Sequence, residues 1–144
     1  MEDKKVTLKL ENVSKVLAKV ESDDVTHALY NVNAQMESGE FISLVGPSGC
    51  GKSTILRLVA GLITPTLGTV SVNGAVVEGP DPNRGMVFQK PTLFPWLTVE
   101  KNIAFSLEMQ GKLKGNEEKV QRMLNIIGLE QFKDDYPGQL SGGM

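Results

Sequence analysis

One stretch of nine residues has the composition and spacing of a phosphate-binding loop. Residues 46–54 match the pattern G-x-x-x-x-G-K-[ST] without a gap. Its glycines let the backbone curl so that successive N–H groups face a phosphate, and a following helix adds partial positive charge from its N-terminus. The predicted nucleotide site comprises Gly46, Pro47, Ser48, Gly49, Cys50, Gly51, Lys52, Ser53 and Thr54.

Each polar residue at the end of this loop has a distinct expected role. Lys52 is expected to reach the β- and γ-phosphates, and the Ser53 hydroxyl is placed to ligate Mg²⁺. Thr54 is expected to contact a more proximal phosphate. Cys50 fills a variable position, where a small tolerated residue is the plainer interpretation and a redox role the alternative.

The elements on both sides of the loop are those that such a loop requires. The nearly continuous apolar run Phe41 to Val45 predicts a strand covered on both faces. After the loop, apolar residues recur at helical spacing from Ile55 to Leu62. Gly61 is placed to help end this helix, and Pro65 prevents its simple continuation.

The segments around this core predict an antiparallel β-portion. Apolar and polar residues alternate over residues 6–13 and 28–36, with a polar loop over residues 21–24 between them. The Asn73-Gly74 pair predicts a hairpin between residues 68–72 and 75–77, because these residues tolerate positive φ. Tyr30 is expected in the core or in a cross-strand pair.

Downstream of the hairpin, the pattern changes from strands to helices. Residues 85–88 predict a short buried strand that ends at Gln89. Thr98 is a candidate cap for a helix that carries Val99, Ile103 and Leu107 on one side. A second amphipathic helix is predicted over residues 117–127, with Gly128 placed to stop it.

The composition of the 144-residue chain excludes several classes of protein. Fifteen basic and 17 acidic side chains without a basic stripe give no support for nucleic acid as a partner. The longest apolar runs are too short to span a bilayer, and the first residues lack an apolar secretory core. One cysteine and one histidine exclude an internal disulfide and a His-rich metal site.

Two further motifs distinguish among the families that share the phosphate loop. Residues 85–89, Gly-Met-Val-Phe-Gln, followed by Leu93-Phe94-Pro95 and residues 97–103, resemble the Q-loop region of ABC ATPases. Residues 140–144, Leu-Ser-Gly-Gly-Met, resemble the LSGGQ signature of that family, with Met in place of the final Gln. The motifs come in the family order, and the variant signature with Phe94-Pro95-Trp96-Leu97 looks most like the nitrate, sulfonate and taurine importer subgroup.

This resemblance implies roles for residues outside the phosphate loop. Gln89 would contact Mg²⁺ and the attacking water, so that Lys52 and Gln89 are the candidate catalytic residues and Ser53 and Gln89 the metal-contacting ones. Ser141, Gly142 and Gly143 would bind the γ-phosphate of a nucleotide held by a second subunit. Plainer roles, a polar strand end and a helix cap, are the alternatives.

The resemblance also implies partners and a location. They are a homodimer of ATPase subunits, transmembrane permease subunits contacted through Leu93, Phe94 and Trp96, and indirectly an extracytoplasmic solute-binding protein. The two ATPase subunits would bind ATP and Mg²⁺ between them. The chain would be cytoplasmic and peripheral on the inner face of the cell membrane.

The sequence departs from the family pattern in two places. The Walker B aspartate, the catalytic glutamate and the switch histidine of the family would follow Met144, so these 144 residues alone are expected to bind nucleotide without hydrolysing it. Family members place an aromatic ring for the adenine base where this chain has Leu17, which leaves base stacking in question.

The expected fold is therefore α/β, a P-loop NTPase core with an antiparallel β-subdomain and a helical subdomain. Residues 1–144 would form the N-terminal part of an ABC-type nucleotide-binding domain, with the helical subdomain from about residue 98 to 144. The leading functional hypothesis is the ATP-binding subunit of an ABC importer. The alternatives are a nucleotide-binding fragment without hydrolysis, an ABC ATPase outside transport, and an unrelated P-loop kinase, which would leave the two downstream motifs unexplained.

Overall fold

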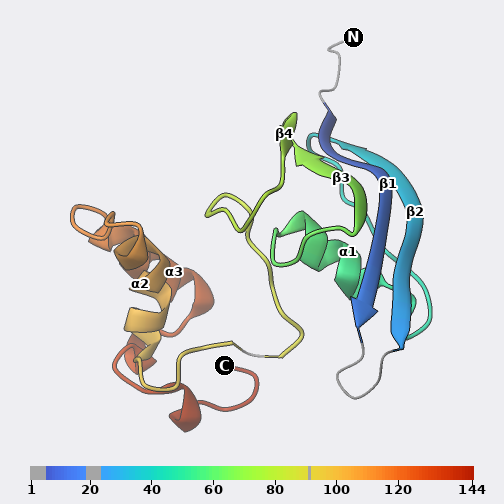
Figure 1. The fold of residues 1–144 in the computed structure, drawn as a ribbon. Coiled ribbons are helices and arrows are strands. Elements are labelled where there is room, and N and C mark those ends of the chain that lie inside the picture. Colours follow the sequence, from blue (N-terminus) through green and yellow to red (C-terminus); the bar gives the residue numbers. More distant parts are fainter. Residues whose placement is uncertain (1–5, 19–23, 91) are drawn as a thin grey trace. The chain divides into compact units, whose positions relative to one another are not determined.

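The computed structural model describes residues 6–18, 24–90 and 92–144, and the chain divides into two compact units between Met86 and Val87 (Figure 1). The first unit contains an antiparallel sheet in the strand order β2-β1-β3-β4 and one helix, α1. The strands are β1 (Val6–Ala18), β2 (Val25–Glu37), β3 (Leu67–Val72) and β4 (Ala75–Val76), and α1 is Lys52–Val59. The predicted β-portion is thus confirmed, although β1 and β2 are longer than expected. Of the predicted loop over residues 21–24, only Asp24 lies within the described residues.

Helix α1 packs against the sheet of the first unit through one apolar core (Figure 1). Leu58 of α1 is 1% exposed and belongs to the same cluster as residues from β1, β2 and β3. Burying each such side chain contributes roughly 1.5–3 kcal/mol. The buried members of this core are Leu10, Val13, Leu29, Leu58, Val70 and Val77.

Two asparagines with positive φ interrupt the ladder between the long strands. Asn12 has φ 51° and Asn31 has φ 48°, and the pairing of β1 with β2 changes register near both. Side chains satisfy the backbone there, because Asn12 N donates to Asn33 Oδ1 at 2.8 Å and Asn31 N donates to Ser14 Oγ at 2.9 Å. Such bulges bend a sheet and increase its twist.

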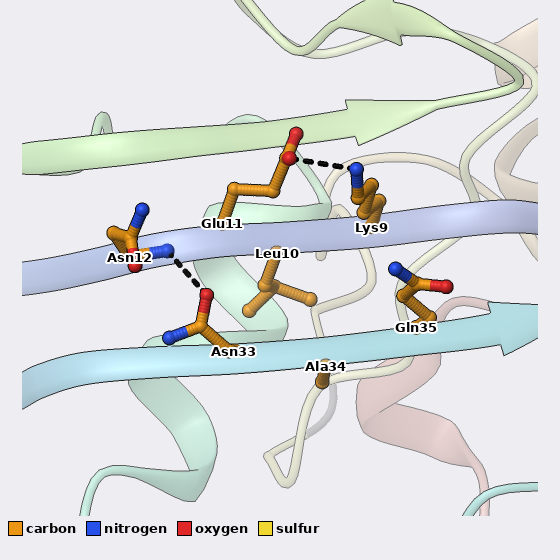
Figure 2. A pocket seen from close by; sticks show the side chains of 7 residues that line it. All are labelled: Lys9, Leu10, Glu11, Asn12, Asn33, Ala34 and Gln35. Carbon is orange, nitrogen blue, oxygen red and sulfur yellow. Dashed lines mark hydrogen bonds and ion pairs between the residues drawn. The ribbon is translucent and has the colours of Figure 1, made fainter.

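A pocket of about 400 Å³ lies on β1 and β2 beside the bulge at Asn12, as Figure 2 shows. Lys9 and Glu11 form an ion pair of 2.6 Å at its wall. None of the lining residues belongs to the predicted nucleotide site. The wall is formed by Lys9, Leu10, Glu11, Asn12, Asn33, Ala34 and Gln35.

The turn between β3 and β4 forms as the sequence predicts. Asn73 and Gly74 have φ values of 51° and 81° and connect two paired strands. Positive φ at both central residues gives a tight turn whose twist matches the flanking strands.

Two predicted strands are absent from the described part of the chain. Residues 40–47 and 85–88 have no regular secondary structure, and Phe41 and Val45 are 94% and 92% exposed. A strand of this type is held by neighbours on both edges, and no described segment pairs with either run. Of the two expected positions of Tyr30, the core is wrong, since its side chain is 82% exposed on β2, and a cross-strand pair stays a prediction.

The second unit is helical, as the periodicity beyond residue 98 predicts. Helices α2 (Val99–Met109) and α3 (Glu117–Ile127) are followed by two 3-10 turns, Glu130–Phe132 and Pro137–Gln139. Gly128 has φ 69° and forms the left-handed C-cap of α3, as expected. The buried core of this unit consists of Val99, Ala104, Val120, Leu124 and Leu129.

We expect Thr98→Ala to lower the free energy of unfolding by about 1 kcal/mol, because Thr98 caps α2. Its side chain accepts a hydrogen bond from Lys101 N at 3.3 Å. Urea unfolding followed by circular dichroism checks this expectation. Ser106→Ala, an exposed change within α2, is the matched control and is expected to be nearly neutral or slightly stabilising. Equal unfolding free energies for the two variants would contradict the capping role.

Candidate nucleotide-binding loop

The predicted phosphate loop forms the approach to the N-terminus of α1. Gly51 is the N-cap of that helix, with φ 95° and ψ 0°, and Ile55 N donates to Gly51 O at 3.0 Å. No side chain caps this end, and the first turn of α1 contains no acidic residue. The first N–H groups of a helix have no partners within the helix, so an end free of side-chain acceptors favours an anion.

The Lys52 ammonium lies across this loop. Its Nζ donates to Gly46 O at 2.7 Å and to Pro47 O at 2.6 Å, and it lies 3.4 Å from Cys50 Sγ. The loop therefore curls around a cation held by backbone oxygens. A phosphate oxygen is a stronger acceptor for an ammonium than a neutral carbonyl, so the donor set of the loop fits the phosphates of a nucleotide.

Gly51 is fixed in place by contact with strand β2. A Cβ atom at this position would lie 2.6 Å from Ala28 O and 2.7 Å from Leu29 Cδ2. Gly49 also has positive φ, at 82°, but the space around it is open. The motif glycines thus have different functions, since Gly49 provides only the turn, whereas Gly51 also allows the loop to lie directly on the sheet.

The remaining loop residues leave polar groups available at the helix start. The Ser53 side chain is exposed and Thr54 is half-buried. A hydroxyl oxygen is a suitable ligand for Mg²⁺, which is bound in nucleotide sites through few protein oxygens together with substrate phosphates. Cys50 is an exposed free thiol that contacts the Lys52 ammonium.

The connector after the hairpin is tied to the end of α1, a feature that sequence reasoning missed. The closest approach is at Gly61, where a Cβ would lie 2.1 Å from Gly79 O. Arg84 Nη2 donates to the same Gly79 oxygen. Within the connector, Asn83 N donates to Asp81 Oδ1 at 2.7 Å, and this hydrogen bond is the main cause that lowers the pKa of Asp81. Asp81-Pro82-Asn83 is a turn sequence, and it would have predicted the turn that this hydrogen bond closes.

The other predicted site residues belong to the second unit. Gln89 is exposed and lies outside regular structure. Leu140 packs against the second core, and the exposed residues 141–144 form a turn in which Met144 N donates to Ser141 O at 2.9 Å. The predicted contacts of Gln89, Ser141, Gly142 and Gly143 with nucleotide stay predictions.

Asn102 is a further feature that the sequence patterns did not single out. Its side-chain amide makes four hydrogen bonds to the backbone of residues 94–98, the segment just before α2. The ring centroids of Phe94 and Trp96 are 5.4 Å apart, and those of Phe94 and Phe105 are 4.4 Å apart. Residues 94–98, in the segment that the resemblance assigns to permease contact, are therefore held by Asn102 and Phe105 of α2.

Within the described residues, none of the helices has the length and apolar character needed to cross a membrane.

Comparison with known proteins identifies the family. The family model described as ABC transporter matches residues 29–144. The nitrate import ATP-binding protein NrtD of a Synechocystis species is 52% identical over 118 residues, which cover 81% of this chain and 44% of that protein. An aliphatic sulfonates import ATP-binding protein, SsuB of Bacillus thuringiensis, is 40% identical over 139 residues, covering 96% of this chain and 54% of that protein.

A solved structure supports the same assignment. The ATP-binding cassette MJ0796, solved as a dimer in a post-hydrolysis state bound to ADP and Pi, superimposes with a TM-score of 0.79 at 34% identity. The match covers 94% of this chain and 64% of that one. The chain spans about half the length of the curated relatives, 44% of one and 54% of the other. The phosphate loop, the fold and these matches agree, and the chain belongs to the ABC transporter family.

Proposed function

We propose that this chain is part of the ATP-binding subunit of an ABC importer, which couples ATP binding and hydrolysis to transport. The observation that carries the proposal is the loop around Lys52, whose ammonium is held by Gly46 O and Pro47 O beside the uncapped start of α1. This arrangement provides one cation and several backbone donors for a chain of phosphates. The membership of the chain in the ABC transporter family supports this proposal.

In this proposal each loop residue has one function in holding the nucleotide. The backbone of residues 46–51 surrounds the β-phosphate, and Lys52 exchanges its carbonyl partners for β- and γ-phosphate oxygens. Ser53 and Gln89 would hold Mg²⁺, which neutralises phosphate charge during transfer to water. Thr54 would contact a phosphate nearer to the ribose.

A second copy of the subunit completes the site in this proposal. The match to a dimeric cassette bound to ADP and Pi supports a dimer. Ser141, Gly142 and Gly143 offer a hydroxyl and backbone N–H groups in an exposed turn, and these are suitable donors for the γ-phosphate held by the partner subunit. Gln89 would report the state of the γ-phosphate bound at its own phosphate loop to the membrane subunits.

The proposed cargo is a small oxyanion of the nitrate or sulfonate kind, including taurine, which is itself a sulfonate. Support comes from the names of the relatives, which are nitrate and aliphatic sulfonate import proteins. Cargo selection would lie with the permease and an extracytoplasmic solute-binding protein. The subunit itself would stay on the cytoplasmic face of the membrane, bound to the permease near Leu93, Phe94 and Trp96.

A second candidate function concerns these 144 residues tested alone, namely nucleotide binding without turnover. It is favoured because residues 46–54 contain no Asp, Glu or His, the side chains that most often take a proton from an attacking water. An ABC ATPase outside transport is the further alternative.

Binding of a fluorescent ATP analogue to the purified 144-residue chain, with phosphate release recorded in the same samples, tests these proposals. We expect saturable binding that requires Mg²⁺ and is reversed by unlabelled ATP. We expect no release of phosphate. Phosphate release would contradict the candidate function without turnover and would support a complete enzyme. Failure of a folded chain to bind at all would contradict the nucleotide site.

A further inference from the structure

The C-terminal end of α1 lies directly against the connector that follows β4 (Figure 1). Gly61 follows the last residue of this end with φ 76°, and its N–H donates to Leu58 O at 3.1 Å. A Cβ at Gly61 would lie 2.1 Å from Gly79 O, 2.4 Å from Gly79 C and 2.9 Å from Pro80 N. The Gly79–Pro80 peptide therefore touches the helix end, and a shift of this peptide changes where α1 ends.

One side chain holds that peptide in place. Arg84 Nη2 donates to Gly79 O, and Arg84 N closes the turn between them by donating to Asp81 O at 2.9 Å. The Arg84 side chain is only 19% exposed, and its Nη1 lies 4.0 Å from Asp81 Oδ2. Its Nε is buried and has no hydrogen-bond partner among the described residues. Because a buried donor without a partner costs free energy, the fold gains little stability from this guanidinium.

The opposite end of α1 is the phosphate loop, and the buried side chain of Leu58 lies between the two ends. A helix rises about 1.5 Å per residue, so along the axis Gly51 lies about 10 Å and Gly61 about 4.5 Å from Leu58. A displacement at Gly61 that tilts α1 about Leu58 therefore moves Gly51 about twice as far. The contact of Gly51 with β2 stops the loop from moving towards the sheet, but a steric contact does not stop it from moving away.

We propose that Arg84 is a positioning residue for the phosphate loop at the far end of α1. By holding the Gly79 carbonyl against Gly61, Arg84 fixes the C-terminal end of the helix and with it the direction of the N–H groups at the helix start. This inference rests on the proposed function, because those N–H groups are the phosphate donors of that function. The effect of Arg84 on the loop is measurable without a nucleotide.

Amide chemical shifts in ¹H–¹⁵N NMR spectra of the chain without nucleotide report the position of the loop. Arg84→Met keeps an apolar stem and removes the donor to Gly79 O, so we expect the amide signals of Gly49 and Gly51 to shift. Arg57→Met is the matched control, because it removes the same charge from an exposed position of α1 itself, and it should cause smaller shifts. Shifts at Gly49 and Gly51 that are no larger in Arg84→Met than in Arg57→Met would overturn the proposal.

Two further comparisons separate positioning from a loss of stability. Since Arg84→Met also removes the buried Nε without a partner, its urea unfolding midpoint should stay at that of the wild type. Arg84→Lys can restore the donor, because the hydrogen bond to Gly79 O uses a single guanidinium nitrogen, and it should return the loop signals towards wild type. Loop shifts that accompany a fall in the midpoint, and that Arg84→Lys does not reverse, would contradict the positioning role.

The second experiment is titration of the same variants with the fluorescent ATP analogue and Mg²⁺. One hydrogen bond contributes roughly two- to tenfold to a binding constant, so a misdirected N–H group at the helix start should weaken binding by Arg84→Met about fivefold. Arg84→Lys should recover part of this loss, and Arg57→Met should bind as the wild type does.

The outcomes distinguish this inference from the proposed function. Equal affinities of the wild type and Arg84→Met would overturn the positioning role, provided that the wild type binds. Failure of a folded wild-type chain to bind would overturn the proposed function and this inference with it, while the loop signals would still show what Arg84 holds in place.

Discussion

Lys52→Ala is expected to weaken binding of an ATP analogue by about a hundredfold or more. The ammonium is held by Gly46 O at 2.7 Å and Pro47 O at 2.6 Å, so its position is already the one that faces the centre of the loop. A hydrogen bond to a charged group contributes roughly 1.5–3 kcal/mol, and 1.4 kcal/mol corresponds to tenfold in affinity.

Equilibrium titration with a fluorescent ATP analogue in the presence of Mg²⁺ measures this loss. Lys114→Ala is the matched control, because it removes the same charge from an exposed position of the second unit. Circular dichroism shows whether each variant keeps its secondary structure. If a folded Lys52→Ala bound as tightly as Lys114→Ala, the loop would not be the nucleotide site.

The parts of the fold that the sequence predicted are those determined by neighbouring residues. Helix α2 begins after its predicted cap Thr98, and α3 begins and ends where apolar spacing and the cap Gly128 place it. The β3–β4 turn forms because Asn73 and Gly74 accept positive φ locally. The positive φ values of Gly49 and Gly51 are also local, because glycine accepts them without strain.

The parts that were not predicted depend on residues distant in sequence. The apolar run 41–45 has the pattern of a central strand, but a strand gains its hydrogen bonds only from neighbouring strands, and in the described residues it has none. The bulges at Asn12 and Asn31 arise from side-chain acceptors on the facing strand, Asn33 and Ser14. The spacing of apolar residues along the sequence does not indicate such pairings.

The candidate site shows the same division between local and distant effects. The sequence motif identified Lys52 and the glycines around it as a candidate site, because their residue types and spacing form a contiguous pattern. It did not reveal that Gly51 lies against Ala28 and Leu29 of β2, a contact made by residues more than 20 positions apart. It also did not identify Asn102, whose role depends on the fold of the segment before α2.

Gly51→Ala is expected to lower the free energy of unfolding of the first unit by about 3 kcal/mol or more, and to abolish nucleotide binding. Two costs add at this position. Any residue with a Cβ is strained at φ 95°, and the added methyl would lie 2.6 Å from Ala28 O and 2.7 Å from Leu29 Cδ2. Backbone strain of this kind costs on the order of 1–3 kcal/mol, and overpacking against a fixed neighbour about as much again.

Gly49→Ala is the control that separates these two costs, because Gly49 has φ 82° but no atom within 4 Å of the added methyl. Gly49→Ala should lower the free energy of unfolding only by the cost of backbone strain, roughly 1–2 kcal/mol. Urea unfolding by circular dichroism and titration with the ATP analogue give both quantities for each variant. Equal unfolding free energies for the two variants would mean that the loop can move off β2 at no cost. The sheet would then not be what holds the phosphate loop in shape. A larger loss for Gly51→Ala would show that β2 supports the curvature of the loop, and thereby the direction in which its N–H groups point.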